Sequence, residues 1–102
     1  MTDANASARA ALEAAHPDLV QLSHRIYEHP ELGYEEVQAA AWLTEVLERA
    51  GFRLQRGFGE MSTAFVASTG SGPLHVAIGA EYDALPEVGH ACGHNVICTA
   101  AL

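Results

Sequence analysis

Hydrophobic residues recur at helical spacing in the first third of the chain. A stretch of helical composition runs from about Ser7 to Glu28. Its apolar residues stand three and four positions apart: Leu19, Leu22 and Ile26. This spacing places them on one face, so it predicts a helix that ends at His29-Pro30. Pro17 predicts a kink or the start of a second half, because proline lacks the N–H of an interior helical position.

A second helical stripe extends from Tyr34 to Ala50. Its apolar residues again recur every three or four positions: Val37, Ala40, Leu43, Leu47 and Ala50. Glu35 and Glu36 lie where negative charge stabilises the positive end of a helix dipole, and Gly51 suits the position after the last helical residue. The stripe predicts core packing, and Trp42 is interpreted as an interior or half-buried aromatic residue.

The pattern becomes strand-like after the second helix. Polar and apolar residues alternate from Phe52 to Phe58, which favours a half-exposed strand, and a second strand is expected over Thr63 to Ser68. After a turn at residues 69–73, Leu74 to Tyr82 is almost continuously apolar. Such a run is typical of a strand covered on both faces.

The end of the chain returns to a helical pattern. A further helix is expected from Val96 to Leu102, with Asn95 as its N-cap. The order of elements predicts an α/β fold in which two helices precede about three strands of a mixed sheet and the start of a further helix.

Composition and charge exclude several classes of function. The chain has 13 acidic residues against five basic ones, all arginine, and a formal charge of −8. Binding to nucleic acid or to an anionic membrane depends on clustered positive charge, so neither is expected. No stretch approaches the roughly 20 apolar residues of a membrane span, and the beginning of the chain lacks the basic start of a signal peptide. A cytoplasmic location is the expectation.

Candidate chemistry is concentrated between Asp83 and Asn95. Cys92 and His94 flank Gly93, whose missing Cβ permits the turned backbone that lets both side chains converge on one ion. A thiolate with an imidazole suits zinc, and manganese, cobalt or nickel where carboxylates complete the site. The nearest further donors are Glu81, Asp83 and His90. His90 ranks below Cys92 and His94 because the glycines around it predict a loop, not a helix that would align it with His94.

Each of these residues also has a simpler interpretation. A lone cysteine is usually a small buried hydrophobe, and an aspartate at a strand end often closes a turn. The context of strand, polar loop and helix favours a site, because open α/β sheets place their sites there. Two other classes of protein remain open. These are a non-catalytic zinc-binding or interaction module, and a thiol-reactive protein that uses Cys92.

Two ordered motifs resemble one enzyme family. Residues 79–86 (GAEYDALP) and 90–95 (HACGHN) resemble the metal-site signature of the M20 amidohydrolases and peptidases, and residues 29–36 (HPELGYEE) resemble a helix-linking segment of that family. The resemblance spans most of the chain. It is strongest to the branch that contains aminobenzoyl-glutamate hydrolases, N-acyl-amino-acid amidohydrolases and related dipeptidases.

The resemblance implies an enzyme that cleaves an amide bond with a water activated by two divalent metal ions, Zn or Mn, with Co or Ni as alternatives. Its substrate would be an N-acyl amino acid, an aminoacyl-glutamate or a dipeptide-like molecule. Cys92 and His94 match metal-ligand positions, and Asp83 is carried over as a catalytic site residue. Glu81 stands where the wider superfamily has histidine, so it is not carried over. Asn95 replaces an aspartate found in many members and reads as a mark of a subfamily.

The resemblance also implies that important parts lie outside these residues. The family's general base and its other ligands occur further along than Leu102. Residues 1–102 are therefore expected to be the amino-terminal portion of a catalytic domain, without the lid or dimerisation domain. We expect little or no activity from this chain alone, and a homodimer for the full-length enzyme.

Overall fold

The computed structural model describes residues 3–102. In this part of the chain the elements are α1 (Ala4–Glu28), α2 (Val37–Arg49), β1 (Arg53–Arg56), the 3-10 turn η1 (Phe58–Glu60), β2 (Phe65–Ser68) and α3 (His94–Ala100). The α/β class expected from the sequence is confirmed. Among these helices, none combines the length and the apolar character needed to cross a membrane.

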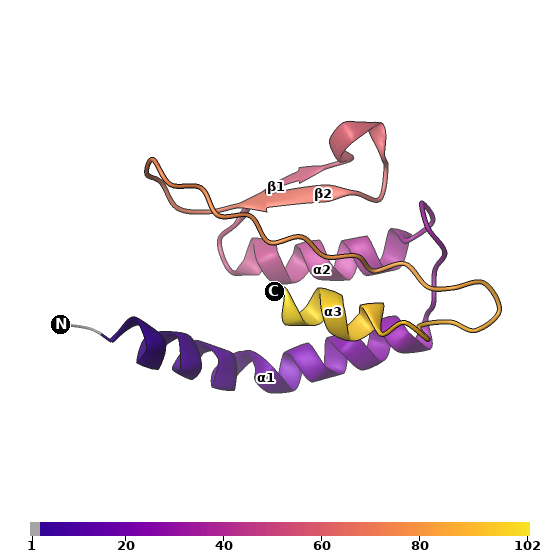
Figure 1. Cartoon of the computed structure of the whole chain (residues 1–102), viewed down its shortest axis with the longest axis horizontal. Coiled ribbons are helices and arrows are strands. Elements are labelled where there is room, and N and C mark those ends of the chain that lie inside the picture. Colours follow the sequence, from indigo (N-terminus) through magenta and orange to yellow (C-terminus); the bar gives the residue numbers. More distant parts are fainter. Residues whose placement is uncertain (1–2) are drawn as a thin grey trace.

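The elements form layers in which α2 separates the β-hairpin from the other two helices. Figure 1 shows the hairpin on one side, α2 beneath it and the long helix α1 on the opposite side. Helix α3 packs against α1, while both strands pack against α2. The residues that connect the hairpin to α3 run as a long extended trace across this stack (Figure 1).

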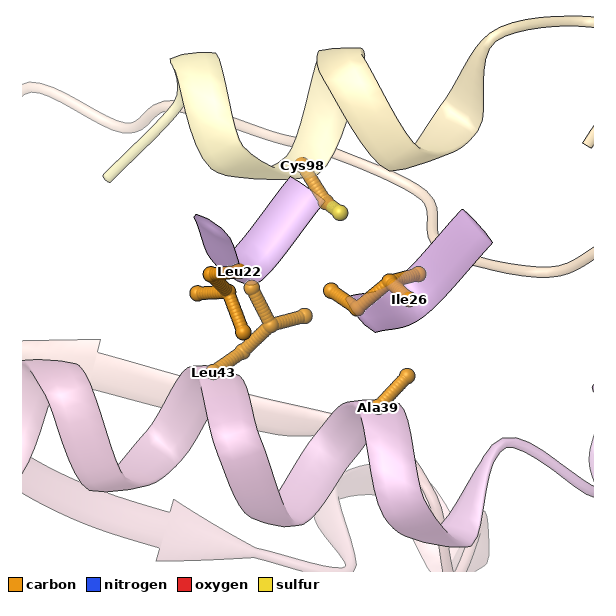
Figure 2. Packing of buried hydrophobic residues seen from close by; sticks show 5 residues of the cluster. All are labelled: Leu22, Ile26, Ala39, Leu43 and Cys98. Carbon is orange, nitrogen blue, oxygen red and sulfur yellow. The ribbon is translucent and has the colours of Figure 1, made fainter. Parts of the chain in front are cut away.

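The hydrophobic core lies where the three helices meet. Figure 2 shows its side chains pointing toward one another from all three helices: Leu22 and Ile26 of α1, Ala39 and Leu43 of α2, and Cys98 of α3. Ile26 and Leu43 are the largest fully buried side chains. Burial of such residues contributes about 1.5–3 kcal/mol each, so this cluster is the main source of packing between the helices.

Helix α1 continues across Pro17 instead of restarting there. Proline removes one intrahelical hydrogen bond, the one to the carbonyl oxygen of Glu13. Both Pro17 and Glu13 are exposed, so water can satisfy that carbonyl group.

Helix α2 begins three residues later than the sequence pattern indicated, at Val37. Glu36 occupies the N-cap position without a side-chain capping bond. The capping group is the carboxylate of Glu31, whose Oε2 and Oε1 accept from the backbone N–H groups of Gln38 (3.0 Å) and Ala39 (2.8 Å). At the other end Gly51 has φ +94°, as expected of the residue that follows a helix.

The two observed strands are antiparallel and shorter than expected. Their register pairs Arg53 with Ser68 and Arg56 with Phe65. They form a two-stranded antiparallel sheet in the described part of the chain, so the prediction of a mixed sheet is wrong here.

The predicted third strand, Leu74 to Tyr82, is also wrong. Within residues 3–102 this segment makes no backbone hydrogen bond to another segment's backbone. Leu74, Val76 and Ile78 are 82%, 81% and 76% exposed, which contradicts a strand covered on both faces. The reason is that a strand exists only when a neighbouring strand pairs with it, and β2 pairs with β1 alone in the described chain.

Candidate functional site

The loop before α3 is held in a closed turn. The backbone groups of Leu85 and Gly89 bond to each other in both directions, at 2.9 Å and 3.1 Å. Gly89 and Gly93 have φ values of +68° and +82°, which confirms the left-handed backbone expected at Gly93. The loop therefore changes direction sharply on both sides of His90-Ala91-Cys92, and Gly93 becomes the N-cap residue of α3.

His94 and Asp83 are brought together by this turn. The Nδ1 atom of His94 lies 2.9 Å from the backbone carbonyl oxygen of Asp83 and 3.0 Å from its Oδ1. A carbonyl oxygen can only accept, so Nδ1 carries the hydrogen. In the neutral imidazole Nε2 then holds the free lone pair. This is the state in which a histidine can bind a metal ion.

Cys92 lies two residues before His94 in the same loop, as a free and exposed thiol. The predicted donors are not all assembled, since no group of three or more His, Cys, Asp or Glu side chains within residues 3–102 is arranged to hold an ion. Glu81 is exposed and makes no side-chain hydrogen bond to the rest of the described chain. The structure thus joins Asp83 to His94 and leaves Cys92 open to solvent.

His90 is buried beside this pair. It is 6% exposed, and neither ring nitrogen has a hydrogen-bond partner in the described chain. Burial lowers the pKa of His90, the nearby His94 lowers it further, and Asp83 opposes both effects. Its imidazole is therefore neutral at pH 7, and it packs under the loop.

Asn95 is not the N-cap of α3, contrary to the sequence-based expectation. It lies inside the first turn of the helix, where it is 7% exposed. Its Nδ2 donates to Oγ of Ser23 (3.1 Å) and toward the carbonyl oxygen of the same residue (3.4 Å). The prediction failed because Gly93 ends the preceding turn and α3 starts two residues earlier than its apolar pattern.

Sequence reasoning missed two residues that hold Asp83 in place. The backbone carbonyl oxygen of Glu31 accepts from the N–H of Ala84 (2.8 Å), and the hydroxyl of Tyr82 donates to the carbonyl oxygen of Thr63. Both Glu31 and Tyr82 lie within the motifs that resemble the M20 family. That was the available signal, but it carries no information about which groups bond.

The most voluminous groove of the described chain, about 860 Å³, lies elsewhere. It is bordered by β2, by the extended residues 74–80 and by the end of α3. Cys92, His94 and Asp83 do not line it. The site is therefore located by its donor atoms and not by the size of a cavity.

Comparison with known proteins gives no matching family profile but several similar proteins. The chain is 37% identical to a p-aminobenzoyl-glutamate hydrolase of Escherichia coli, over 89% of this chain and 22% of that protein. It is 42% identical to Xaa-Arg dipeptidase of Homo sapiens, over 84% of this chain and 23% of that protein. It is 28% identical to hippurate hydrolase of Campylobacter jejuni, over 80% of this chain and 25% of that protein.

The chain is a homologue of the M20-type hydrolases. The resemblance drawn from the motifs is thereby confirmed, and the chain comes from a family of enzymes. It spans 22% to 25% of the length of these three M20-type relatives.

Proposed function

We propose that this chain is part of a metal-dependent amide hydrolase in which Nε2 of His94 and Sγ of Cys92 bind a divalent ion. The observation that carries the proposal is the pair of contacts from His94 Nδ1 to Asp83. Histidines that bind metals almost always donate their other N–H to a carboxylate or carbonyl group, and Asp83 supplies both. The names of the relatives, which are hydrolases and a dipeptidase, support the hydrolytic class.

The donor set fits zinc, and manganese, cobalt or nickel where further carboxylates complete the site. Two such ions, once bound, would polarise the scissile carbonyl group and lower the pKa of a bound water. Asp83 contacts His94 and keeps the imidazole in the tautomer with a free Nε2. Its role is therefore to orient the ligand and not to react itself. Cys92 acts as a ligand and not as a nucleophile.

The substrate class that we propose is an N-acyl amino acid, an aminoacyl-glutamate or a dipeptide. The relatives' names support it, since they include p-aminobenzoyl-glutamate hydrolase and Xaa-Arg dipeptidase. We place residues 1–102 in the amino-terminal portion of a catalytic domain that works in the cytoplasm as a homodimer. The general base and the other ligands come from further polypeptide, so the chain alone has little activity. The lack of a three-donor cluster in residues 3–102 supports this division.

Cobalt(II) binding tests the proposed ligands directly. We expect the chain to bind Co²⁺ with the charge-transfer absorption of a cobalt-thiolate bond. Cys92→Ser should abolish that band, and His94→Ala should weaken binding, because each removes one donor. Cys98→Ser is the matched control, since Cys98 is 3% exposed in the helical core. Full cobalt content with an unchanged spectrum in both site variants would reject the assignment.

The exposure of Cys92 also favours a second candidate, a thiol-reactive protein without a metal. Thiol labelling of the chain with and without a chelator separates the two functions. Protection of Cys92 that depends on added metal supports the hydrolase. Equal and rapid labelling in both conditions, with tight Co²⁺ binding absent, supports the thiol-reactive protein.

A further inference from the structure

Tyr82 is attached to the rest of the fold on both its ring and its hydroxyl. The ring stacks on Phe65 of β2, with centroids 5.9 Å apart and planes at 27°. The hydroxyl donates to the backbone carbonyl oxygen of Thr63, a residue that is 6% exposed. Burial raises the pKa of Tyr82 to about 12, helped by the charges of Glu36 and Cys98, so the hydroxyl stays a donor at neutral pH.

This attachment comes at the end of a segment that has little else to hold it. Residues 74–82 make no backbone hydrogen bonds to other backbone groups in the described chain. Directly after them, the N–H of Ala84 donates to the carbonyl oxygen of Glu31. Asp83 therefore lies between two anchors, one to the residues before β2 and one to the residues before α2.

The position of Asp83 matters because His94 contacts it twice. Nδ1 of His94 lies within hydrogen-bond distance of both the carbonyl oxygen and Oδ1 of Asp83. Hydrogen bonds weaken steeply as distance and angle depart from these values. A residue that fixes the backbone at position 82 therefore controls how well Asp83 can hold the imidazole.

We propose that Tyr82 is a positioning residue of the candidate metal centre, which holds Asp83 through its hydroxyl bond to Thr63 so that Asp83 keeps His94 in the metal-binding tautomer. The proposal rests on the proposed function for its consequence in binding. The geometry that it describes belongs to the chain without metal and can be measured there.

Nitrogen-15 NMR of the imidazole groups in the metal-free chain tests this role. The spectra are recorded well above the pH range in which histidines gain a proton. We expect the tautomer with hydrogen on Nδ1 to dominate at His94 in the wild type. Tyr82→Phe keeps the ring but removes the hydroxyl, so it should lower that fraction and weaken Co²⁺ binding by about tenfold. Tyr27→Phe is the control, because Tyr27 is 60% exposed.

An Asp83→Asn background shows whether Tyr82 acts through Asp83. In that background Tyr82→Phe should add little further change at His94, because coupled residues are not additive. Circular dichroism checks that each variant folds. If Tyr82→Phe does not fold, Phe65→Leu loosens the same ring from outside the site and must shift the His94 tautomer in the same direction.

The outcomes separate the two proposals. An unchanged His94 tautomer in folded Tyr82→Phe, or in Phe65→Leu where the first variant fails to fold, overturns the positioning role. A tautomer that depends on Tyr82 in a chain that binds no Co²⁺ supports the positioning role and overturns the proposed function.

Discussion

Asn95 and Ser23 join α3 to α1 through a buried hydrogen bond across 72 residues of sequence, with Nδ2 of Asn95 3.1 Å from Oγ of Ser23. Ser23 is 9% exposed and Asn95 is 7% exposed, so neither group has ready access to water as an alternative partner. This bond lies beside the core cluster that includes Leu22 and Cys98. It therefore fixes how the helix that begins at the candidate site sits on the longest helix.

Replacement of Asn95 should destabilise the fold. Asn95→Ala leaves the Ser23 hydroxyl buried without its partner, which costs about 1–3 kcal/mol of unfolding free energy. Asn95→Asp keeps an acceptor but cannot donate to Ser23, and it buries a charge, so we expect at least as large a loss. Urea denaturation followed by Trp42 fluorescence measures both. Asn5→Ala, at an exposed position near the start of α1, is the control. Equal stability of all three variants would contradict the role of this bond.

The carboxylate of Glu31 should stabilise the start of α2. Glu31→Ala removes the acceptor of the Gln38 and Ala39 N–H groups, so we expect a loss of about 1 kcal/mol, the usual cost of losing a helix cap. Amide exchange at these two residues should accelerate more than elsewhere in α2. Glu35→Ala is a matched control, because Glu35 is exposed and its side chain makes no hydrogen bond in the described chain. The role is wrong if both variants behave alike.

The extended segment that follows the hairpin should exchange its amide hydrogens quickly. Backbone groups without hydrogen-bond partners have little protection, and Leu74, Val76 and Ile78 are highly exposed. Leu54 and Ala67, which pair in the hairpin, should exchange more slowly and are the internal reference. Hydrogen exchange with mass spectrometry at low protein concentration measures this contrast. Protection of residues 74–80 equal to that of the hairpin would contradict the unpaired backbone.

Stability should fall at alkaline pH, in part because of Cys98. Burial raises the pKa of its thiol from 9.0 to about 11, so the folded chain holds this proton more tightly than the unfolded chain. The contribution is complete below about pH 9 and is lost as the pH rises toward 11. Tyr82, with its pKa raised from 10.0 to about 12, extends the loss to higher pH.

The urea midpoint at a series of pH values from 7 to 11 measures this dependence. In Cys98→Ala the midpoint should decline less steeply above pH 9, although the variant is less stable throughout because it leaves a small cavity. Cys92→Ala should follow the wild-type curve, since Cys92 is exposed. An identical slope in Cys98→Ala and wild type would contradict the proposed effect of burial.

The sequence by itself determined the helices, the hairpin and the family. Leu22, Ile26 and Leu43 are buried as their spacing predicted, because helical geometry places residues three and four apart on one face whatever surrounds the helix. Gly51 and Gly93 have the positive φ values that their positions indicated. The motifs around His29-Pro30 and Cys92-Gly93-His94 were sufficient to indicate the M20-type relatives.

Only the tertiary structure decided which groups meet. The apolar run from Leu74 to Tyr82 has the composition of a strand, but pairing needs a neighbour that local sequence does not specify. The contacts of His94 with Asp83 and of Asn95 with Ser23 join residues 11 and 72 positions apart. No local periodicity encodes such contacts, since they depend on how α1, α2 and α3 pack around the core.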